Sequence, residues 1–283
     1  MTDTSSTPTD DEFTTASGGP AENGLALVTG ASSGIGLGLA RHLVQNGFDV
    51  VVVAEDDALG AAADALRVSG RQVLAVQADL SRPEGVEEVW TQVLGTGRPL
   101  AAAALNAGVA VGGRFADTPL ERHLEVVDLD VRSTVHLAKL VVDQMVGTGS
   151  GRILVTSSIA ATAPGPFHAT YAASKAFAHS FAEAIRHELK DTGVSVTSLM
   201  PGPTDTHFFE RADMEETPIA QGPKDDPVEV AGKGFEAMMA GKPHVVPGMR
   251  NRLMSEAATH LPDRLATPGM GAQTKPPEDD PTG

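Results

Sequence analysis

The stretch TGASSGIG, residues 29–36, places three glycines between an apolar run and an amphipathic pattern of helical period. The run LALVTG, residues 25–30, predicts a buried strand, and the pattern near 34–46 predicts a helix. In such a strand–turn–helix unit the first glycine permits a sharp reversal. The other two let the backbone approach a pyrophosphate and let the helix pack on the strand. The helix N-terminus offers free N–H groups and a partial positive charge to that anion. The stretch therefore indicates a nucleotide-binding βαβ unit rather than a simple turn.

The same alternation of apolar runs and helical patterns continues along the chain. Further strands are predicted at 49–55, 72–79, 100–108, 151–158 and 194–202, with 244–248 as a candidate seventh, and further helices near 57–69, 83–94, 119–146, 170–192 and 227–240. Strands rich in β-branched residues, each followed by a helix, imply βαβ units and a parallel sheet. Right-handed crossovers then place helices on both faces. The expected fold is α/β, a doubly wound and mostly parallel sheet of about seven strands in a three-layer sandwich.

The two ends of the chain differ in composition from its middle. Residues 1–23 are acidic, rich in Ser and Thr, and free of Lys and Arg. They cannot bury enough apolar surface to offset the entropy of ordering, so we expect them to be disordered. Residues 24–261 are expected to form a single domain, and residues 262–283 a Pro-rich flexible tail.

The composition argues against several classes of protein. No apolar run reaches the ~18 residues of a membrane span, and the N-terminus lacks the pattern of a secretory signal. The chain has no cysteine, which excludes disulfides, and its histidines form no HExxH pair, so no metal site is expected. A net charge of −16 argues against a nucleic-acid partner. We therefore expect a cytoplasmic protein that acts on a small molecule.

The stretch YAASK, residues 171–175, holds the only tyrosine of the chain. Residues four apart share one face of a helix, with Cβ atoms ~5–6 Å apart, so Lys175 is expected beside the phenol of Tyr171. A nearby ammonium favours the phenolate and lowers the phenol pKa from ~10 toward neutrality. Tyr171 is therefore a candidate proton donor to a carbonyl, or proton acceptor from an alcohol. A Tyr and a Lys on a helix are otherwise ordinary surface residues, so the assignment depends on the accompanying motifs.

Several motifs in one order carry a resemblance to a known family. They are TGASSGIG, then NAG at 106–108, then YAASK, then the PG of 201–202 followed by Thr206. This set resembles the short-chain dehydrogenase/reductase family over residues ~24–250. The resemblance implies hydride transfer between a nicotinamide cofactor and a secondary alcohol or ketone. It makes Tyr171 the general acid or base, while Lys175 lowers the phenol pKa and orients the cofactor ribose.

A serine completes the set of catalytic candidates. Ser158 ends the predicted strand 151–158 and precedes Tyr171 by the offset seen in the family. Its hydroxyl can donate to the oxygen on which negative charge develops. Ser157 is adjacent, and the offset favours Ser158.

Asp130 marks a departure from the family pattern. Family members usually carry Asn here, where it supports a water that links the lysine to solvent, whereas this chain reads VVDLDVRST over 126–134. Asp can accept hydrogen bonds from the water and from Lys175, so a proton relay is retained in one interpretation. A nearby anion would raise the pKa of Tyr171 and favour charged Lys175. In the other interpretation Asp130 is a tolerated surface variant.

The end of the second strand bears on the choice of cofactor. VVVVAEDD places Glu55, Asp56 and Asp57 together, without Arg or Lys in the loop. An acid here accepts hydrogen bonds from the ribose hydroxyls, and three carboxylates would repel a 2′-phosphate, so NAD(H) is favoured over NADP(H). Whether Glu55 or Asp56 meets the ribose stays open. The full set of expected cofactor residues is Thr29, Gly30, Ser32, Ser33, Gly34, Ile35, Gly36, Glu55, Asp56, Asp79, Leu80, Asn106, Ala107, Gly108, Tyr171, Lys175, Pro201, Gly202, Thr204 and Thr206.

The resemblance also bears on the substrate side and on assembly. In the family, the segment corresponding to 203–226 covers the substrate, and such segments often close on binding. His168 and Phe208 are candidate substrate contacts. The helices at 119–146 and 170–192 pair with their copies in the family, which implies a homotetramer or a dimer. Two other functions remain open: a nucleotide-binding sensor or regulator without redox turnover, and a lyase or dehalogenase relative that works without nicotinamide.

Overall fold

The computed structural model describes residues 24–276. The predictions for residues 1–23 and for residues 277–283 lie outside the described part. Within it, no helix is both long and apolar enough to cross a bilayer.

A seven-stranded parallel sheet forms the centre of the molecule, in the order β3-β2-β1-β4-β5-β6-β7. The strands are β1 (Leu25–Thr29), β2 (Asp49–Ala54), β3 (Val73–Gln77), β4 (Leu100–Leu105), β5 (Gly151–Thr156), β6 (Val194–Leu199) and β7 (His244–Val245). The doubly wound α/β fold expected from the sequence is confirmed. The chain moves outward from β1 in one direction through β2 and β3, and then in the other through β4. The carboxyl ends of β1 and β4 therefore border a crevice of the kind in which such sheets bind ligands.

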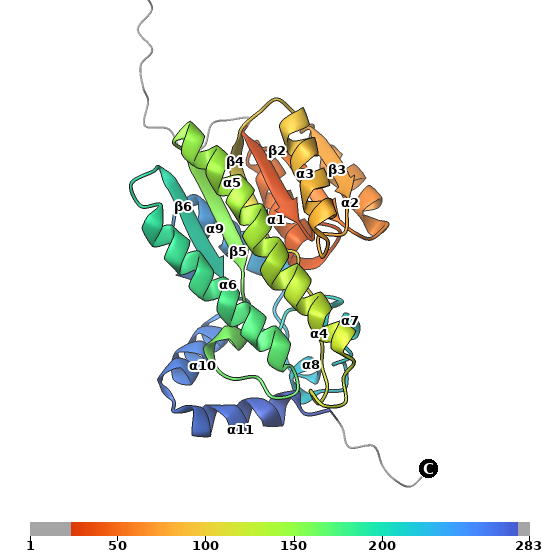
Figure 1. Cartoon of the computed structure of the whole chain (residues 1–283), viewed down its shortest axis with the longest axis vertical. Coiled ribbons are helices and arrows are strands. Elements are labelled where there is room, and N and C mark those ends of the chain that lie inside the picture. The colour runs from red at the N-terminus through yellow and green to blue at the C-terminus, as the bar shows by residue number, and fades with distance from the viewer. Residues whose placement is uncertain (1–23, 277–283) are drawn as a thin grey trace, which may run out of the picture.

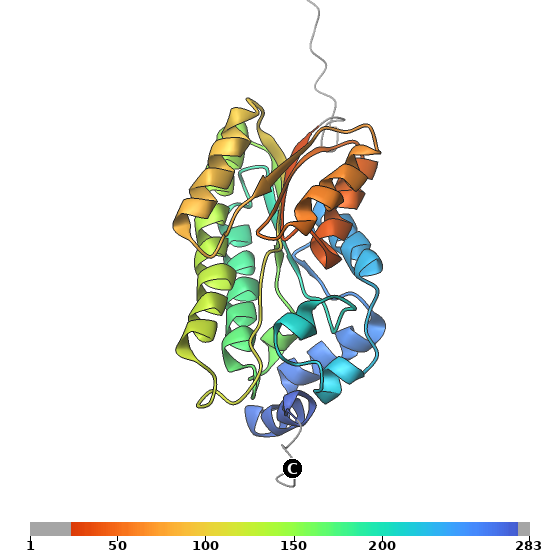
Figure 2. The same ribbon diagram turned by 90° about the vertical axis from the view of Figure 1, so that its right-hand side faces the viewer.

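Helices cover both faces of the sheet and make three layers (Figures 1 and 2). One face carries α3 (Pro83–Gly95), α5 (Thr134–Thr148) and α6 (Ala169–Glu188), and the other carries α1 (Gly34–Gln45), α2 (Ala58–Arg67) and α9 (Pro227–Met239). The alternation along β1 shows how one strand serves both cores. Leu25 and Leu27 belong to the core under α3, α5 and α6, whereas Ala26 and Val28 belong to the core under α1, α2 and α9. Because both faces are buried, the strand is continuously apolar.

The long helix predicted at 119–146 is divided by a π-helical turn. The segment runs as α4 (Leu120–Val126), the π-helix η1 (Val127–Ser133) and α5. π turns inside α-helices often occur at functional sites. Here the π turn contains Asp130, whose side chain is fully buried beneath α6. Asp130 is therefore not a surface variant.

Four of the helices that follow β6 lie beyond the carboxyl ends of the central strands (Figure 1). They are α7 (Phe208–Arg211), α8 (Pro218–Gln221), α10 (Met249–His260) and α11 (Asp263–Thr274). The presence of α11 differs from the flexible tail expected from residue 262. A hydrogen bond from Thr274 Oγ1 to the Pro166 carbonyl, at 2.7 Å, ties α11 to the loop that precedes α6. This tertiary contact offsets the low helical propensity of a segment that contains Pro268.

Candidate active site

The glycine loop joins β1 to the N-terminus of α1. Gly30 and Gly34 have φ values of 64° and 55°, a region that favours glycine. A Cβ on Gly36 would lie 2.0 Å from the Gly30 carbonyl oxygen, so no side chain fits there. Ser33 at the helix N-cap makes no side-chain capping bond. The first N–H groups of α1 therefore remain available to an anion.

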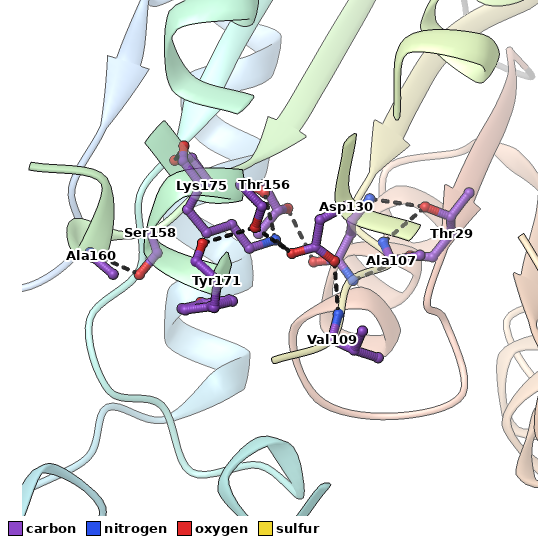
Figure 3. Close-up of polar contacts among 12 residues, drawn as sticks. Thr29, Ala107, Val109, Asp130, Thr156, Ser158, Ala160, Tyr171 and Lys175 are labelled. Atoms are coloured by element: carbon purple, nitrogen blue, oxygen red, sulfur yellow. Dashed lines mark hydrogen bonds and ion pairs between the residues drawn. The ribbon is translucent and has the colours of Figure 1, made fainter. Parts of the chain in front are cut away.

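Polar side chains tie the loop to the neighbouring strands (Figure 3). Thr29 Oγ1 accepts hydrogen bonds from the backbone N–H of Asn106 at 2.9 Å and of Ala107 at 3.0 Å. The Asn106 side chain donates to the Thr29 carbonyl at 3.2 Å and accepts from Thr156 Oγ1 at 3.1 Å. These bonds fix the carboxyl ends of β1, β4 and β5 relative to one another. Thr29 is thus structural and lies behind the pocket wall.

The pocket at this edge of the sheet gathers most of the residues predicted from sequence. Of the expected cofactor and substrate residues, only Thr29 and Asp79 do not line it. Asp79 instead accepts hydrogen bonds from the backbone and the hydroxyl of Ser81, at 2.9 and 2.6 Å, and pairs with Arg82. Its carboxylate fixes its own turn, and its neighbour Leu80 reaches the pocket.

The acidic end of β2 presents two carboxylates to the pocket. Asp56 accepts a hydrogen bond from Ser32 Oγ at 2.8 Å, which links it to the glycine loop. Glu55 also lines the pocket, and its pKa is raised, chiefly by burial and then by the charge of Asp79. Arg211 of α7 lies 3.7 Å from Asp56. This arginine is distant in sequence, and no signal in the loop after β2 indicated it.

Ser158, Tyr171 and Lys175 converge on the pocket from two elements (Figure 3). Ser158 follows β5, and its Oγ accepts from the backbone N–H of Ala160 at 3.1 Å. Tyr171 and Lys175 come from α6, and the Lys175 Nζ lies 5.5 Å from the centre of the Tyr171 ring. Ser157 is buried and donates to the Lys175 backbone carbonyl at 2.7 Å. The structure therefore assigns the two serines different positions, with Ser158 near the phenol.

Asp130 sits directly behind Lys175, without an intervening group (Figure 3). Its Oδ2 is 3.1 Å from the Lys175 Nζ and accepts a hydrogen bond from Ser174 Oγ at 3.0 Å. Its Oδ1 accepts from the backbone N–H of Val109 at 2.9 Å. The direct contact with Lys175, which the first interpretation of Asp130 allowed, is here an ion pair.

Burial and charge set the protonation of these groups. Burial is the largest cause that raises the pKa of Tyr171; the Lys175 charge and a hydrogen bond with Ser158 oppose it, and Asp130 adds to it. Burial alone would lower the pKa of Lys175, but the charge of Asp130 reverses the direction and raises it. Burial lowers the pKa of His168 to about 4, so this imidazole is neutral at ordinary pH.

The far end of the pocket is largely apolar. The rings of Tyr171 and Phe208 lie with their centres 5.2 Å apart, and those of Tyr171 and His168 6.1 Å apart. The remaining wall comes from segments after β6, and only its α10 and α11 part lies outside the segment 203–226 that was expected to cover the substrate. These lining residues are Phe209, Met214, Ile219, Met254, Met270, Gln273 and Thr274. Among residues 24–276, no group of three or more His, Cys, Asp or Glu is arranged to hold a metal ion.

Comparisons with known proteins agree with this geometry. The sequence model of the family described as short chain dehydrogenase matches residues 24–217. The chain is 38% identical over 185 residues to 1-deoxy-11-beta-hydroxypentalenate dehydrogenase of Streptomyces exfoliatus, covering 64% of this chain and 67% of that one. It is 34% identical over 216 residues to an uncharacterized oxidoreductase of Myxococcus xanthus, covering 74% and 83%.

A solved structure shows the same architecture. The short-chain dehydrogenase from Sphingobium yanoikuyae, in complex with NADPH, superposes with a TM-score of 0.74 at 29% identity, covering 83% of this chain and 93% of that one. The family match extends over most of the domain that carries the glycine loop and the Ser158, Tyr171 and Lys175 cluster. The chain belongs to the short-chain dehydrogenase family, a family of oxidoreductases.

Proposed function

We propose that the protein interconverts a secondary alcohol and a ketone with a nicotinamide cofactor, NAD(H) in preference to NADP(H). The observation that carries the proposal is the convergence of Ser158, Tyr171 and Lys175 on a pocket that also contains the glycine loop. The test is a screen of the purified protein for NADH and NADPH oxidation against a panel of uncharged ketones. Failure of every ketone, together with tight cofactor binding, would favour a sensor without redox turnover.

The residues at the β1–α1 turn fit a dinucleotide. The space that a Cβ on Gly36 would fill is occupied by backbone, and the uncapped N–H groups of α1 face the same turn. Pro201, Gly202, Thr204 and Thr206 also line the pocket, and Thr206 lies against the loop, since its Cγ2 is 2.9 Å from where a Cβ on Gly34 would be. When bound, the nicotinamide supplies or accepts the hydride.

The chain's own residues handle the proton and the substrate oxygen. Ser158 donates a hydrogen bond to that oxygen and holds it beside the phenol. Tyr171 gives its proton to the oxygen as a carbonyl is reduced, or takes it as an alcohol is oxidised. Lys175, with its charge 5.5 Å from the ring, stabilises the phenolate that forms.

The pocket favours an uncharged and largely apolar substrate. Phe208 covers one side of Tyr171, and His168, neutral because of burial, lies on another. The lysine and arginine side chains that line the pocket, Lys175 and Arg211, are each paired with a carboxylate. A substrate carboxylate would find no free counter-ion on this wall.

NAD(H) should be used with a higher kcat/KM than NADP(H). Glu55 and Asp56 line the pocket and would repel a 2′-phosphate, although Arg211 beside Asp56 weakens this effect. Replacing Glu55 with Ser and Asp56 with Arg should shift the ratio of the two kcat/KM values toward NADP(H) by about tenfold or more, equivalent to ~1.4 kcal/mol. Asp57→Asn is the control, because Asp57 bonds with Gln77 outside the pocket lining. A wild-type enzyme that prefers NADPH would contradict the assignment.

A homotetramer, or at least a dimer, is the proposed assembly. Apolar side chains stay exposed along α4, η1 and α5, where Leu124, Val127 and Val135 are 47, 39 and 40% exposed. On the adjacent α6 the rings of Phe177 and Phe181 stack at 5.6 Å. We expect Val135→Lys to dissociate the assembly, because it places a charge within an apolar contact. Light scattering that shows only a 29.2 kDa species for the wild type at micromolar concentration would contradict the proposal.

A further inference from the structure

A second charge lies behind the pair formed by Tyr171 and Lys175. The Asp130 side chain is 0% exposed and that of Lys175 is 7% exposed, so water does not screen their attraction. The Lys175 Nζ is 3.1 Å from Asp130 Oδ2 but 5.5 Å from the centre of the Tyr171 ring. The ammonium is therefore closer to an opposite charge than to the ring. The carboxylate therefore opposes part of the field that the ammonium exerts on the phenol.

The surroundings hold the Asp130 side chain in place. Its two oxygens receive hydrogen bonds from the backbone N–H of Val109 and from Ser174, besides the contact with Lys175. These contacts fix the carboxylate beside the Lys175 ammonium. The backbone also packs against the pair, because a Cβ on Gly108 would lie 2.8 Å from Lys175 Nζ and 3.0 Å from Asp130 Oδ1.

We propose that Asp130 is a positioning residue that opposes part of the charge of Lys175 at the phenol. Tyr171 thereby stays protonated, so that the site is set for carbonyl reduction rather than alcohol oxidation. The inference rests on the proposed function and adds a preferred direction to it. The proton passes from the Tyr171 oxygen to the substrate oxygen, which carries the electron pair released as the carbonyl carbon receives hydride. The phenolate then regains a proton from solvent.

The charges around the phenol agree with this assignment. Burial is the largest cause of the raised pKa of Tyr171, and Asp130 acts in the same direction, against Lys175 and Ser158. His168, from the segment before α6, is neutral above its pKa of about 4, and α7 presents the apolar ring of Phe208. Among the described residues, Lys175 and Asp130 are thus the charged groups that shift the pKa of Tyr171. Removing the anion should leave the ammonium unopposed and lower the pKa of the phenol.

A direct titration tests the proposal without any substrate. Tyr171 is the only tyrosine of the chain, so the near-ultraviolet absorbance of tyrosinate in the full-length protein reports its ionisation alone. In the wild type we expect a midpoint above the ~10 of free tyrosine, or no ionisation until far-ultraviolet circular dichroism shows unfolding. Asp130→Asn removes the charge and keeps an oxygen for the Val109 N–H. Its midpoint should lie about one pH unit or more below that of the wild type, in folded protein.

Two further variants complete the experiment. Asp130→Ser also removes the charge and keeps a hydroxyl acceptor. It replaces Asp130→Asn in the titration if the Asn variant does not fold. Asp128→Asn is the matched control, because Asp128 lies in the same π turn but pairs with Arg132 at the surface. Its midpoint should equal that of the wild type.

The outcomes separate this inference from the proposed function. Equal midpoints in the wild type and the folded position-130 variant, or a wild-type midpoint below ~10, would overturn the role of Asp130. If the protein reduces none of the ketones, the proposed function fails, but the titration of Tyr171 still tests the role of Asp130. Loss of turnover in Tyr171→Phe, together with an unchanged Tyr171 midpoint in the position-130 variant, would keep the function and remove this inference.

Discussion

Tyr171→Phe is expected to lower kcat by about 10²–10⁴-fold while cofactor affinity stays within a few fold. In the proposed reaction the phenol oxygen carries the transferred proton, and a phenyl ring has no proton to transfer in its place. The phenyl ring that remains still packs against Phe208, whose ring centre lies 5.2 Å away, so the pocket should keep its shape.

Steady-state kinetics with the substrate found in the ketone screen measures the loss, and titration of NADH fluorescence measures cofactor binding. Circular dichroism confirms that the variant is folded. A variant that keeps most of its turnover would refute the assignment of Tyr171. A variant that loses cofactor binding instead would show that the phenol holds the nucleotide rather than the proton.

Lys175→Met should cost ~3–5 kcal/mol in the free energy of unfolding, because it leaves the fully buried carboxylate of Asp130 without its counter-ion. Val109 and Ser174 still donate to that carboxylate, but neither carries a charge. The double variant Lys175→Met/Asp130→Asn should recover most of the loss, since a neutral amide replaces the uncompensated charge. Urea denaturation, monitored by circular dichroism, gives the free energy of unfolding of the wild type, the single variant and the double variant.

The chain offers a matched control for this experiment. Lys139 pairs with Asp143 on the surface of α5, where the two side chains are 70 and 58% exposed. Lys139→Met should therefore change the free energy of unfolding by no more than ~1 kcal/mol, as is usual for exposed ion pairs. If both lysine variants are equally stable, the contact between Lys175 and Asp130 does not hold in solution.

Much of the fold could be predicted because its signals are local. The glycine loop, the apolar strands and the helices between them follow short-range patterns, and the order of βαβ units determines the sheet. The choice of Ser158 as the partner of Tyr171 rested on the offset between the two residues in the resembling family. The same reasoning failed where a segment depends on distant contacts. The sequence VVDLDVRST reads as a continuous helix, and nothing in it indicates the π turn that carries Asp130 inward.

The pocket wall shows the same division between local and distant information. The cofactor side comes from strand ends, which the sequence locates well, whereas Arg211 and Met270 come from helices whose docking depends on the rest of the fold. Asp79 was expected at the pocket by analogy, but its side chain turns back to Ser81. The direct contact between Asp130 and Lys175 likewise depends on how α6 packs on η1, which no spacing rule supplies.

The helix α11 contributes to the pocket wall with residues that are added late in protein synthesis. A ribosome produces the glycine loop early and Thr274 more than two hundred residues later, and chains begin to fold from their N-terminal part during synthesis. A nascent chain can therefore complete its central strands and display the nucleotide crevice while the bond from Thr274 to Pro166 is still absent. We therefore expect a stage of synthesis at which the cofactor side of the pocket has formed and the α11 wall has not.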